Sequence, residues 1–219
     1  MVDRAPQERI RTITIPPVGL EGLLGLPTAT RGIVLFAHGS GSGRFSPRNN
    51  FVAQALRGAG LATLLFDLLT ADEAQDRRNV FNIELLARRL SMAAAWVRDD
   101  SETTNLPVGY FGASTGAAAA LVAAAADQGR VAAIVSRGGR PDLAGSALRS
   151  VRAPTLLIVG GDDVEVLALN RAALAELRCQ KELVVVPGAT HLFEEAGTLE
   201  AVVEHARGWF SEHFGEVGT

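Results

Sequence analysis

The chain has 219 residues, of which 47% are hydrophobic and 21% are charged, and its formal net charge is −3. This length predicts one compact domain over residues 1–219 with a sizeable buried core. A net negative charge gives no overall basic character for attracting nucleic acid or an acidic membrane surface. The longest apolar run, residues 117–126, has about half the length that crossing a bilayer requires. We therefore expect no nucleic-acid partner and no membrane partner.

The cysteine content and the N-terminal residues bear on the cellular compartment of the protein. The one cysteine, Cys179, excludes an intramolecular disulfide and fits a reducing environment. Residues 1–9 lack the apolar core of a signal peptide. We therefore expect a cytoplasmic protein, and no feature of the sequence predicts its oligomeric state.

The first two expected elements are edge strands. Residues 9–15 alternate apolar and polar side chains, as a half-buried strand does, and Pro16 and Pro17 end this pattern. Residues 18–26 are expected to return as a second edge strand.

From residue 32 onward, short apolar runs alternate with helical patterns. The apolar runs, typical of strands covered on both faces, are residues 33–36, 61–66, 108–111, 131–135, 155–159 and 183–186. The helical segments are residues 49–57, 80–98, 115–127, 166–177 and 199–214. This alternation predicts an α/β fold, a parallel sheet with helices on both faces. Only a short segment, residues 141–149, separates two of the runs, so no inserted lid domain is expected.

The pentapeptide Gly112-Ala113-Ser114-Thr115-Gly116 lies between an apolar run and an alanine-rich helical segment. Strand, Gly-x-Ser-x-Gly and helix is the order of a nucleophile elbow, a sharp turn that exposes a serine hydroxyl above the sheet edge. The two glycines leave space for the strand and the helix to pack closely. The pentapeptide therefore makes Ser114 a candidate nucleophile.

A serine nucleophile requires an imidazole to take its proton and a carboxylate to orient that imidazole. His205 and His213 fall within a helical pattern and are expected to be surface or cap residues. His191 follows the last apolar run and is therefore the candidate base. Candidate acids are Asp162 and Asp163, which follow the run at 155–159 in a Gly-Gly-Asp-Asp turn, and Asp142, which follows the preceding run. Gly and Asp also favour such turns for purely structural reasons.

The glycine-rich segment after the run at 33–36 reads His38-Gly39-Ser40-Gly41-Ser42-Gly43. We expect the backbone N–H groups of Ser40 and Thr115 to form an oxyanion hole. The candidate substrate contacts are Gly39, Gly41 and Arg44. Arg44 is equally well explained as a solvated loop charge. Arg137 is open to the same two interpretations, a group that reaches the site or a solvated charge. His38 is expected to be structural. The segment lacks the spacing of a phosphate-binding loop, so no nucleotide cofactor is expected.

These residues resemble an α/β-hydrolase of the dienelactone hydrolase-like group. The resemblance covers nearly the whole chain and rests on four segments: 38–42, 112–116, 160–163 and 188–193. It implies about eight mostly parallel strands, no metal or other cofactor, and hydrolysis through an acyl-enzyme. It also implies that Asp163 is the acid and that Asp162 caps the following turn or helix. Dienelactone hydrolases carry a cysteine nucleophile, whereas this chain carries Ser114, and Cys179 is expected to be an inert thiol.

Together, the residues and the resemblance predict a cofactor-independent serine esterase acting on a small-molecule carboxylic ester, with Ser114, His191 and Asp163 as its triad. Lactone hydrolysis and acyl transfer are alternatives that the same triad supports. A peptidase is less favoured, because nothing in the sequence selects peptides. A non-catalytic binding module with a vestigial site is the alternative from another class.

Overall fold

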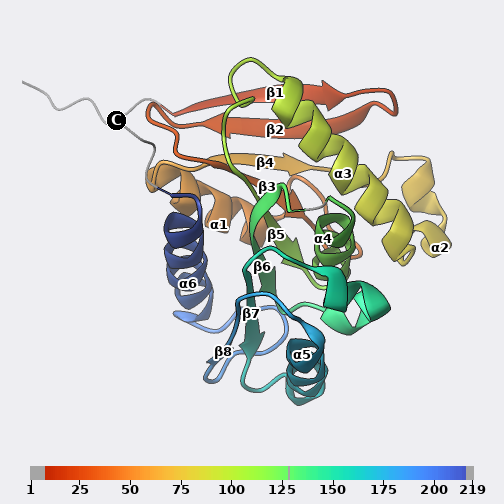
Figure 1. Ribbon diagram of the computed structural model, residues 1–219, viewed down its shortest axis with the longest axis vertical. Coiled ribbons are helices and arrows are strands. Elements are labelled where there is room, and N and C mark those ends of the chain that lie inside the picture. The colour runs from red at the N-terminus through yellow and green to blue at the C-terminus, as the bar shows by residue number, and fades with distance from the viewer. Residues whose placement is uncertain (1–7, 128, 216–219) are drawn as a thin grey trace, which may run out of the picture.

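The computed structural model describes residues 8–127 and 129–215, which form one eight-stranded sheet covered by helices on both faces (Figure 1). The strand order is β1-β2-β4-β3-β5-β6-β7-β8. Strands β3 to β8 pair in parallel, whereas β1 and β2 form an antiparallel hairpin that joins the sheet through β4. The predicted α/β fold is therefore confirmed, and no separate lid is inserted between the elements of the described ranges.

The strands closely follow the apolar runs of the sequence. They are β1 (Arg9–Ile15), β2 (Leu20–Leu26), β3 (Ile33–Ala37), β4 (Ala62–Phe66), β5 (Val108–Ala113), β6 (Val131–Arg137), β7 (Thr155–Gly160) and β8 (Lys181–Val186). Every residue of β3, β4, β5 and β7 is buried, as expected for strands covered on both faces.

Strand β8 is more exposed than the sequence predicts. The apolar run at 183–186 predicted a strand buried on both faces, but only Val186 is buried, and Val185 is 37% exposed. The reason is position: β8 is the last strand of the sheet, where helices cover its faces incompletely. An apolar run alone does not distinguish an edge strand from a central one.

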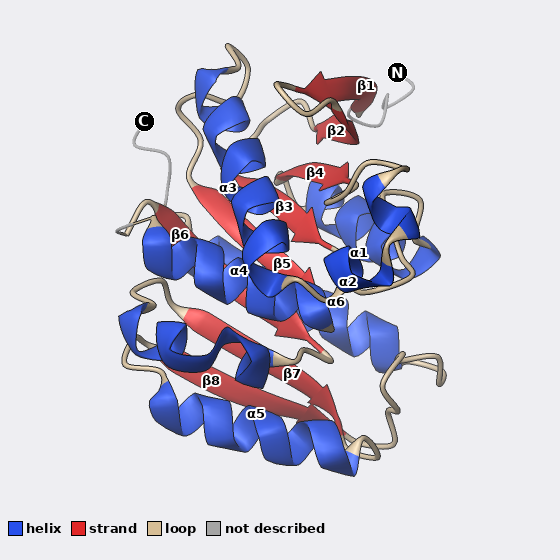
Figure 2. Ribbon diagram, turned by 90° about the vertical axis from the view of Figure 1, so that its right-hand side faces the viewer, coloured by secondary structure: helices blue, strands red, loops and turns tan. Residues whose placement is uncertain are grey.

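Two helices cover one face of the sheet, α1 (Pro47–Gly58) and α6 (Thr198–His213), and three cover the other, α3 (Ile83–Asp99), α4 (Thr115–Ala126) and α5 (Val164–Glu176) (Figure 2). A short helix, α2 (Arg77–Val80), and two 3₁₀ segments, η1 (Glu73–Gln75) and η2 (Pro141–Ser150), complete the described elements. The buried apolar side chains accordingly form two main cores, one on each side of the sheet.

The helix expected at 80–98 begins later than predicted. Asn82 accepts a hydrogen bond from the Leu85 backbone N–H at 3.0 Å and so starts α3 at Ile83. An Asn side chain at this position satisfies one of the backbone N–H groups that a helix leaves unpaired at its start. The preceding residues form α2 and η1, which the apolar pattern did not predict.

Alanine-rich α4 packs between the sheet and its neighbours α3 and η2, and most of its residues are buried. Small side chains permit this close approach on every side. None of the helices in the described part of the chain combines the length and the apolar character needed to cross a membrane.

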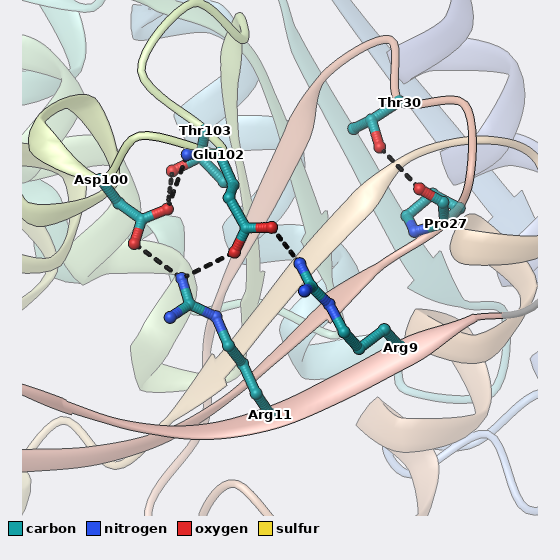
Figure 3. A network of polar contacts seen from close by, with 7 residues as sticks. All are labelled: Arg9, Arg11, Pro27, Thr30, Asp100, Glu102 and Thr103. Atoms are coloured by element: carbon teal, nitrogen blue, oxygen red, sulfur yellow. Dashed lines mark hydrogen bonds and ion pairs between the residues drawn. The ribbon is translucent and has the colours of Figure 1, made fainter.

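A polar network holds the edge hairpin to the loop between α3 and β5 (Figure 3). Arg11 Nη2 lies 2.6 Å from Asp100 Oδ2, and Arg9 pairs with Glu102. Asp100 also accepts a hydrogen bond from the Glu102 backbone N–H at 3.1 Å. Exposed pairs of this kind contribute little to stability, about 0–1 kcal/mol each. The backbone pairing of β2 with β4 attaches the hairpin to the sheet, and the ion pairs add contacts between the hairpin and the loop.

Candidate active site

Ser114 forms the turn between β5 and α4. Its backbone dihedrals, φ 50° and ψ −123°, lie where L-residues are strained. A Cβ atom on Gly112 would lie 2.5 Å from Ala117 Cα, and one on Gly116 would lie 2.0 Å from Ala37 O. Both glycines therefore supply the space that the sequence pattern predicted, and the strand-turn-helix geometry of the elbow is present.

We predict opposite effects for two Gly→Ala substitutions in helices. Gly116→Ala places a methyl group against the β3 backbone, so it should lower the free energy of unfolding by about 2–3 kcal/mol. Gly208 lies in α6, and a Cβ atom there would have no heavy atom within 4 Å. Gly208→Ala should therefore raise the free energy of unfolding by about 0.5–1 kcal/mol. Urea denaturation of both variants measures this difference, and equal effects would show that α4 does not pack on β3 as described.

His191 and Asp163 are joined by a hydrogen bond. His191 Nδ1 lies 2.7 Å from Asp163 Oδ2. Because a carboxylate oxygen only accepts, Nδ1 carries the proton and Nε2 is left with a lone pair. The His191 side chain is 39% exposed, so Nε2 is available to take a proton from an incoming group.

The other two candidate acids make different contacts. Asp142 pairs with Arg140 at 2.8 Å, and Asp162 is exposed. The expectation that Asp162 caps the following helix is wrong, because Asp163 itself occupies the N-cap position of α5. The Asp163 carboxylate makes no cap hydrogen bond and is turned toward His191 instead. The Asp162 backbone N–H donates to Ala189 O at 3.0 Å, which ties the β7 loop to the His191 loop.

Ser114 and His191 line one cavity of about 230 Å³, together with Gly39, Ser40 and Arg137 among others. Among the described residues, no hydrogen bond to the Ser114 hydroxyl is formed, including one from Oγ to His191 Nε2. Contacts between a nucleophile and its base are often longer without substrate and shorten in the complex. The cavity therefore brings Ser114 and His191 together, and Asp163 reaches it through its hydrogen bond to His191.

The glycine-rich loop lies directly against Ser114. Ser42 N–H donates to Gly39 O at 3.2 Å and closes a turn with Ser40 and Gly41 at its tip, where Gly41 has a φ of 69°. A Cβ atom on Gly39 would lie 2.9 Å from Ser114 Cβ. Only a glycine permits this approach of backbone to nucleophile.

The two candidate oxyanion donors flank Ser114. Ser40, at the tip of the glycine-rich turn, lines the Ser114 cavity. Thr115 is the first residue of α4, where a backbone N–H has no partner within the helix. It lines an adjoining cavity of about 890 Å³, which Ser40 and Gly39 also line.

His38 links this loop to the one after β4, as expected for a structural residue. Leu68 N–H donates to His38 Nε2 at 3.1 Å, so Nδ1 carries the proton and contacts Gly39 O at 3.0 Å. Burial lowers the pKa of His38, which keeps the ring neutral at pH 7. A neutral His38 preserves both contacts and holds Gly39 next to the nucleophile.

Arg44 does not line the Ser114 cavity. It pairs with Asp67 and lies 2.6 Å from Glu21, and it lines the adjoining larger cavity instead. Two carboxylates thus neutralise its charge, and its side chain is only 17% exposed, so Arg44 is not a solvated loop charge. Its contact with a substrate stays a prediction. Arg137, by contrast, is buried at the end of β6 and lines the Ser114 cavity.

Other residues around the site were not recognised from the sequence. Arg48 lines both cavities and pairs with Glu194 at 2.9 Å, and Phe193, with a φ of 56°, packs beneath Arg137. Phe193 closes the segment 188–193 and Arg48 follows Arg44 by four residues, but the sequence pattern assigned a role to neither of them. His205 is exposed, and His213 contacts Trp209 O at 2.8 Å near the end of α6, as expected for surface or cap residues.

Cys179 is remote from this cavity. It is partly buried, and its Sγ lies 3.7 Å from Thr155 Oγ1 at the opposite end of β7. Within residues 8–127 and 129–215, no group of three or more His, Cys, Asp or Glu side chains is arranged to hold a metal ion.

Comparison with known proteins places the chain in a family. The model of the dienelactone hydrolase family matches residues 20–212. A putative phosphoribosyl transferase of Mycobacterium tuberculosis is 61% identical over 197 residues, which cover 90% of this chain and 44% of that protein. The chain therefore spans less than half the length of this curated relative.

Solved structures agree with the family match. The crystal structure of a dienelactone hydrolase from Anabaena variabilis has 55% sequence identity and a TM-score of 0.91, and the match covers 95% of this chain and 98% of that one. A cold-adapted esterase from an Arctic intertidal metagenomic library has 20% identity and a TM-score of 0.73, covering 93% and 94%, which shows a shared fold alone. The chain therefore belongs to the dienelactone hydrolase family, within the α/β-hydrolase fold.

Proposed function

We propose that this protein is a serine hydrolase that cleaves small carboxylic esters through an acyl-enzyme on Ser114. The observation that carries the proposal is the Asp163–His191 hydrogen bond of 2.7 Å at a cavity shared by His191 and the strained Ser114. Membership of a hydrolase family supports the reaction class.

In this mechanism, His191 Nε2 takes the Ser114 proton as Oγ attacks the ester carbonyl. Asp163 holds His191 in the Nδ1–H tautomer and stabilises the imidazolium that forms. The backbone N–H groups of Ser40 and Thr115 bind the oxyanion of the tetrahedral intermediate. His191 then protonates the leaving alkoxide, and a water activated by the same ring releases the acid.

Lactone hydrolysis is a second candidate, favoured by the Anabaena variabilis relative, which is described as a dienelactone hydrolase. Acyl transfer would follow if an alcohol replaced water in the second step. The M. tuberculosis relative is named for phosphoribosyl transfer, and this chain matches 44% of its length. We do not propose that activity for this chain.

The test is turnover by the purified protein of p-nitrophenyl butyrate and, separately, of γ-butyrolactone, without added cofactor. We expect release of p-nitrophenol at a rate well above the buffer rate, and the ratio of the two kcat/KM values separates esterase from lactonase. Addition of a primary alcohol, with detection of a new ester, identifies acyl transfer. No turnover of either substrate, combined with no covalent labelling by a fluorophosphonate, would favour a non-catalytic binding module.

A further inference from the structure

The loop that follows β6, residues 138–140, contacts both the nucleophile and the base. The Arg140 backbone N–H donates a hydrogen bond to Ser114 O at 3.0 Å. A Cβ atom on Gly138 would lie 3.0 Å from His191 O and 3.7 Å from His191 Nδ1. The position of this loop therefore bears on the backbone of Ser114 and on the ring of His191 at once.

Asn170, a buried residue of α5, holds the centre of this loop. Its Nδ2 donates to Gly139 O at 2.9 Å and to Val166 O, one turn earlier in the helix, at 2.8 Å. A Cβ atom on Gly139 would lie 2.0 Å from Ser136 Oγ and 2.6 Å from Ala117 Cβ, so β6 and α4 also press on the loop. The Asn170 amide thus supplies the hydrogen bond that ties the confined loop to α5.

Packing alone does not explain an asparagine at this position. The other buried residues of α5 are Val166, Leu167 and Ala173, all apolar. Asn is a weaker helix former than Leu. The Oδ1 atom of Asn170 is buried and has no hydrogen-bond partner among the described residues, which is unfavourable. A leucine would avoid both costs, so the donor to Gly139 O is what distinguishes the asparagine.

Helix α5 also carries the third residue of the proposed triad. Asp163 is its N-cap residue, about two turns before Asn170, and the Asp163 carboxylate lies 2.7 Å from His191 Nδ1. The Asn170 amide therefore links the loop that holds Ser114 to the helix that orients His191.

We infer that Asn170 is a positioning residue for ester hydrolysis. Through Gly139 O and the Arg140 N–H, it holds Ser114 in the place from which His191 can take its proton. This inference rests on the proposed serine hydrolase function. Asn170 does not line the Ser114 cavity or the larger cavity beside it, so it touches no substrate. Its loss should lower kcat and leave KM nearly unchanged.

Asn170→Leu removes the donor to Gly139 O and keeps a side chain suited to a buried helix face. We expect kcat for p-nitrophenyl butyrate to fall about 10- to 100-fold, because a small misplacement of a reacting group has an effect of this size. The KM should stay within about threefold of the wild type. Steady-state release of p-nitrophenol over a range of ester concentrations gives both constants.

Asn170→Thr is the second variant, for the case that Asn170→Leu does not fold. A threonine hydroxyl can still donate to Val166 O, one turn earlier, but it ends one bond short of the Asn170 Nδ2 position and loses the contact with Gly139 O. We expect the same pattern, a lower kcat and an almost unchanged KM.

The control is Leu177→Ala, which weakens the packing of α5 from the end opposite Asp163. Leu177 is 1% exposed and follows the last residue of the helix. The urea midpoint of this variant should fall, because an apolar side chain is lost from the core, while its kcat should stay within about threefold of the wild type. A folded Asn170 variant with the wild-type kcat would overturn the inference, as would an equal loss of kcat in Leu177→Ala.

Amide hydrogen exchange tests the link without turnover. We expect the Arg140 N–H to exchange at least about tenfold faster in the Asn170 variants than in the wild type. The Ile134 N–H, which donates to Pro154 O at 2.8 Å in the middle of β6, should keep its rate. A wild type that hydrolyses no ester would contradict the proposed function, and the exchange rates would still show whether Asn170 holds the loop. Unchanged exchange at Arg140 would contradict the inference itself.

Discussion

Replacing Ser114 by alanine is expected to lower kcat for a short-chain p-nitrophenyl ester by about 10⁵- to 10⁶-fold. The substitution removes the one oxygen that can form the acyl-enzyme, while the glycine-rich loop and the His191–Asp163 pair remain. Only the residual rate from substrate binding and oxyanion stabilisation is left. Steady-state release of p-nitrophenol, measured against buffer, gives the factor.

The matched control is Ser42→Ala, which removes a hydroxyl from the same cavity without touching the elbow. We expect its kcat to stay within about threefold of the wild type, because Ser42 is exposed and alanine retains the backbone N–H that closes the turn to Gly39. Thermal denaturation should show folded protein for both variants. A Ser114→Ala protein that is folded and turns over the ester as fast as the wild type would show that another group is the nucleophile.

Asp163→Asn is expected to lower kcat by about 10⁴-fold at pH 7. An asparagine of the same shape can hold His191 in place, but it offers an N–H as well as an oxygen, so the ring loses its preference for the Nδ1–H tautomer. It also removes the negative charge that stabilises the imidazolium. The kcat of the variant on the same ester measures the combined loss.

Asp162→Asn is the control for this prediction, because it makes the same chemical change one residue earlier. Asp162 is exposed and contacts the His191 loop through its backbone N–H, which asparagine retains. Its kcat should therefore stay within about threefold of the wild type. The reverse pattern, a large loss in Asp162→Asn and a small one in Asp163→Asn, would assign the acid to Asp162.

The sheet and its helices could be predicted from the sequence because each element has its own pattern of apolar residues over a short stretch of the chain. Runs such as 33–36 and 108–111 are apolar throughout, and they became fully buried central strands. The start of α3 and the exposure of β8 could not be predicted in the same way. The start of α3 depends on a single N-cap hydrogen bond to Asn82, and the exposure of β8 depends on the position of that strand at the edge of the sheet.

The candidate site, too, could be predicted from the sequence only in part. Ser114, His191 and the glycine-rich loop follow strand ends, so the topology brings them to one edge. The choice between Asp162 and Asp163 needed the direction of a side chain, which spacing leaves open. The same holds for Arg44 and Arg137: one is paired with two carboxylates and the other lines the Ser114 cavity, and only three-dimensional contacts separate them.

The most direct test of an acyl-enzyme on Ser114 is to trap it. Wild-type protein is mixed with excess p-nitrophenyl butyrate, quenched in acid within milliseconds and digested, and mass spectrometry then locates the butyryl group. We predict one butyryl group on the peptide that contains Ser114, and none in Ser114→Ala. Turnover with the butyryl group on another residue, such as Cys179, or with no acyl-enzyme under conditions that show a burst of p-nitrophenol, would contradict the proposal.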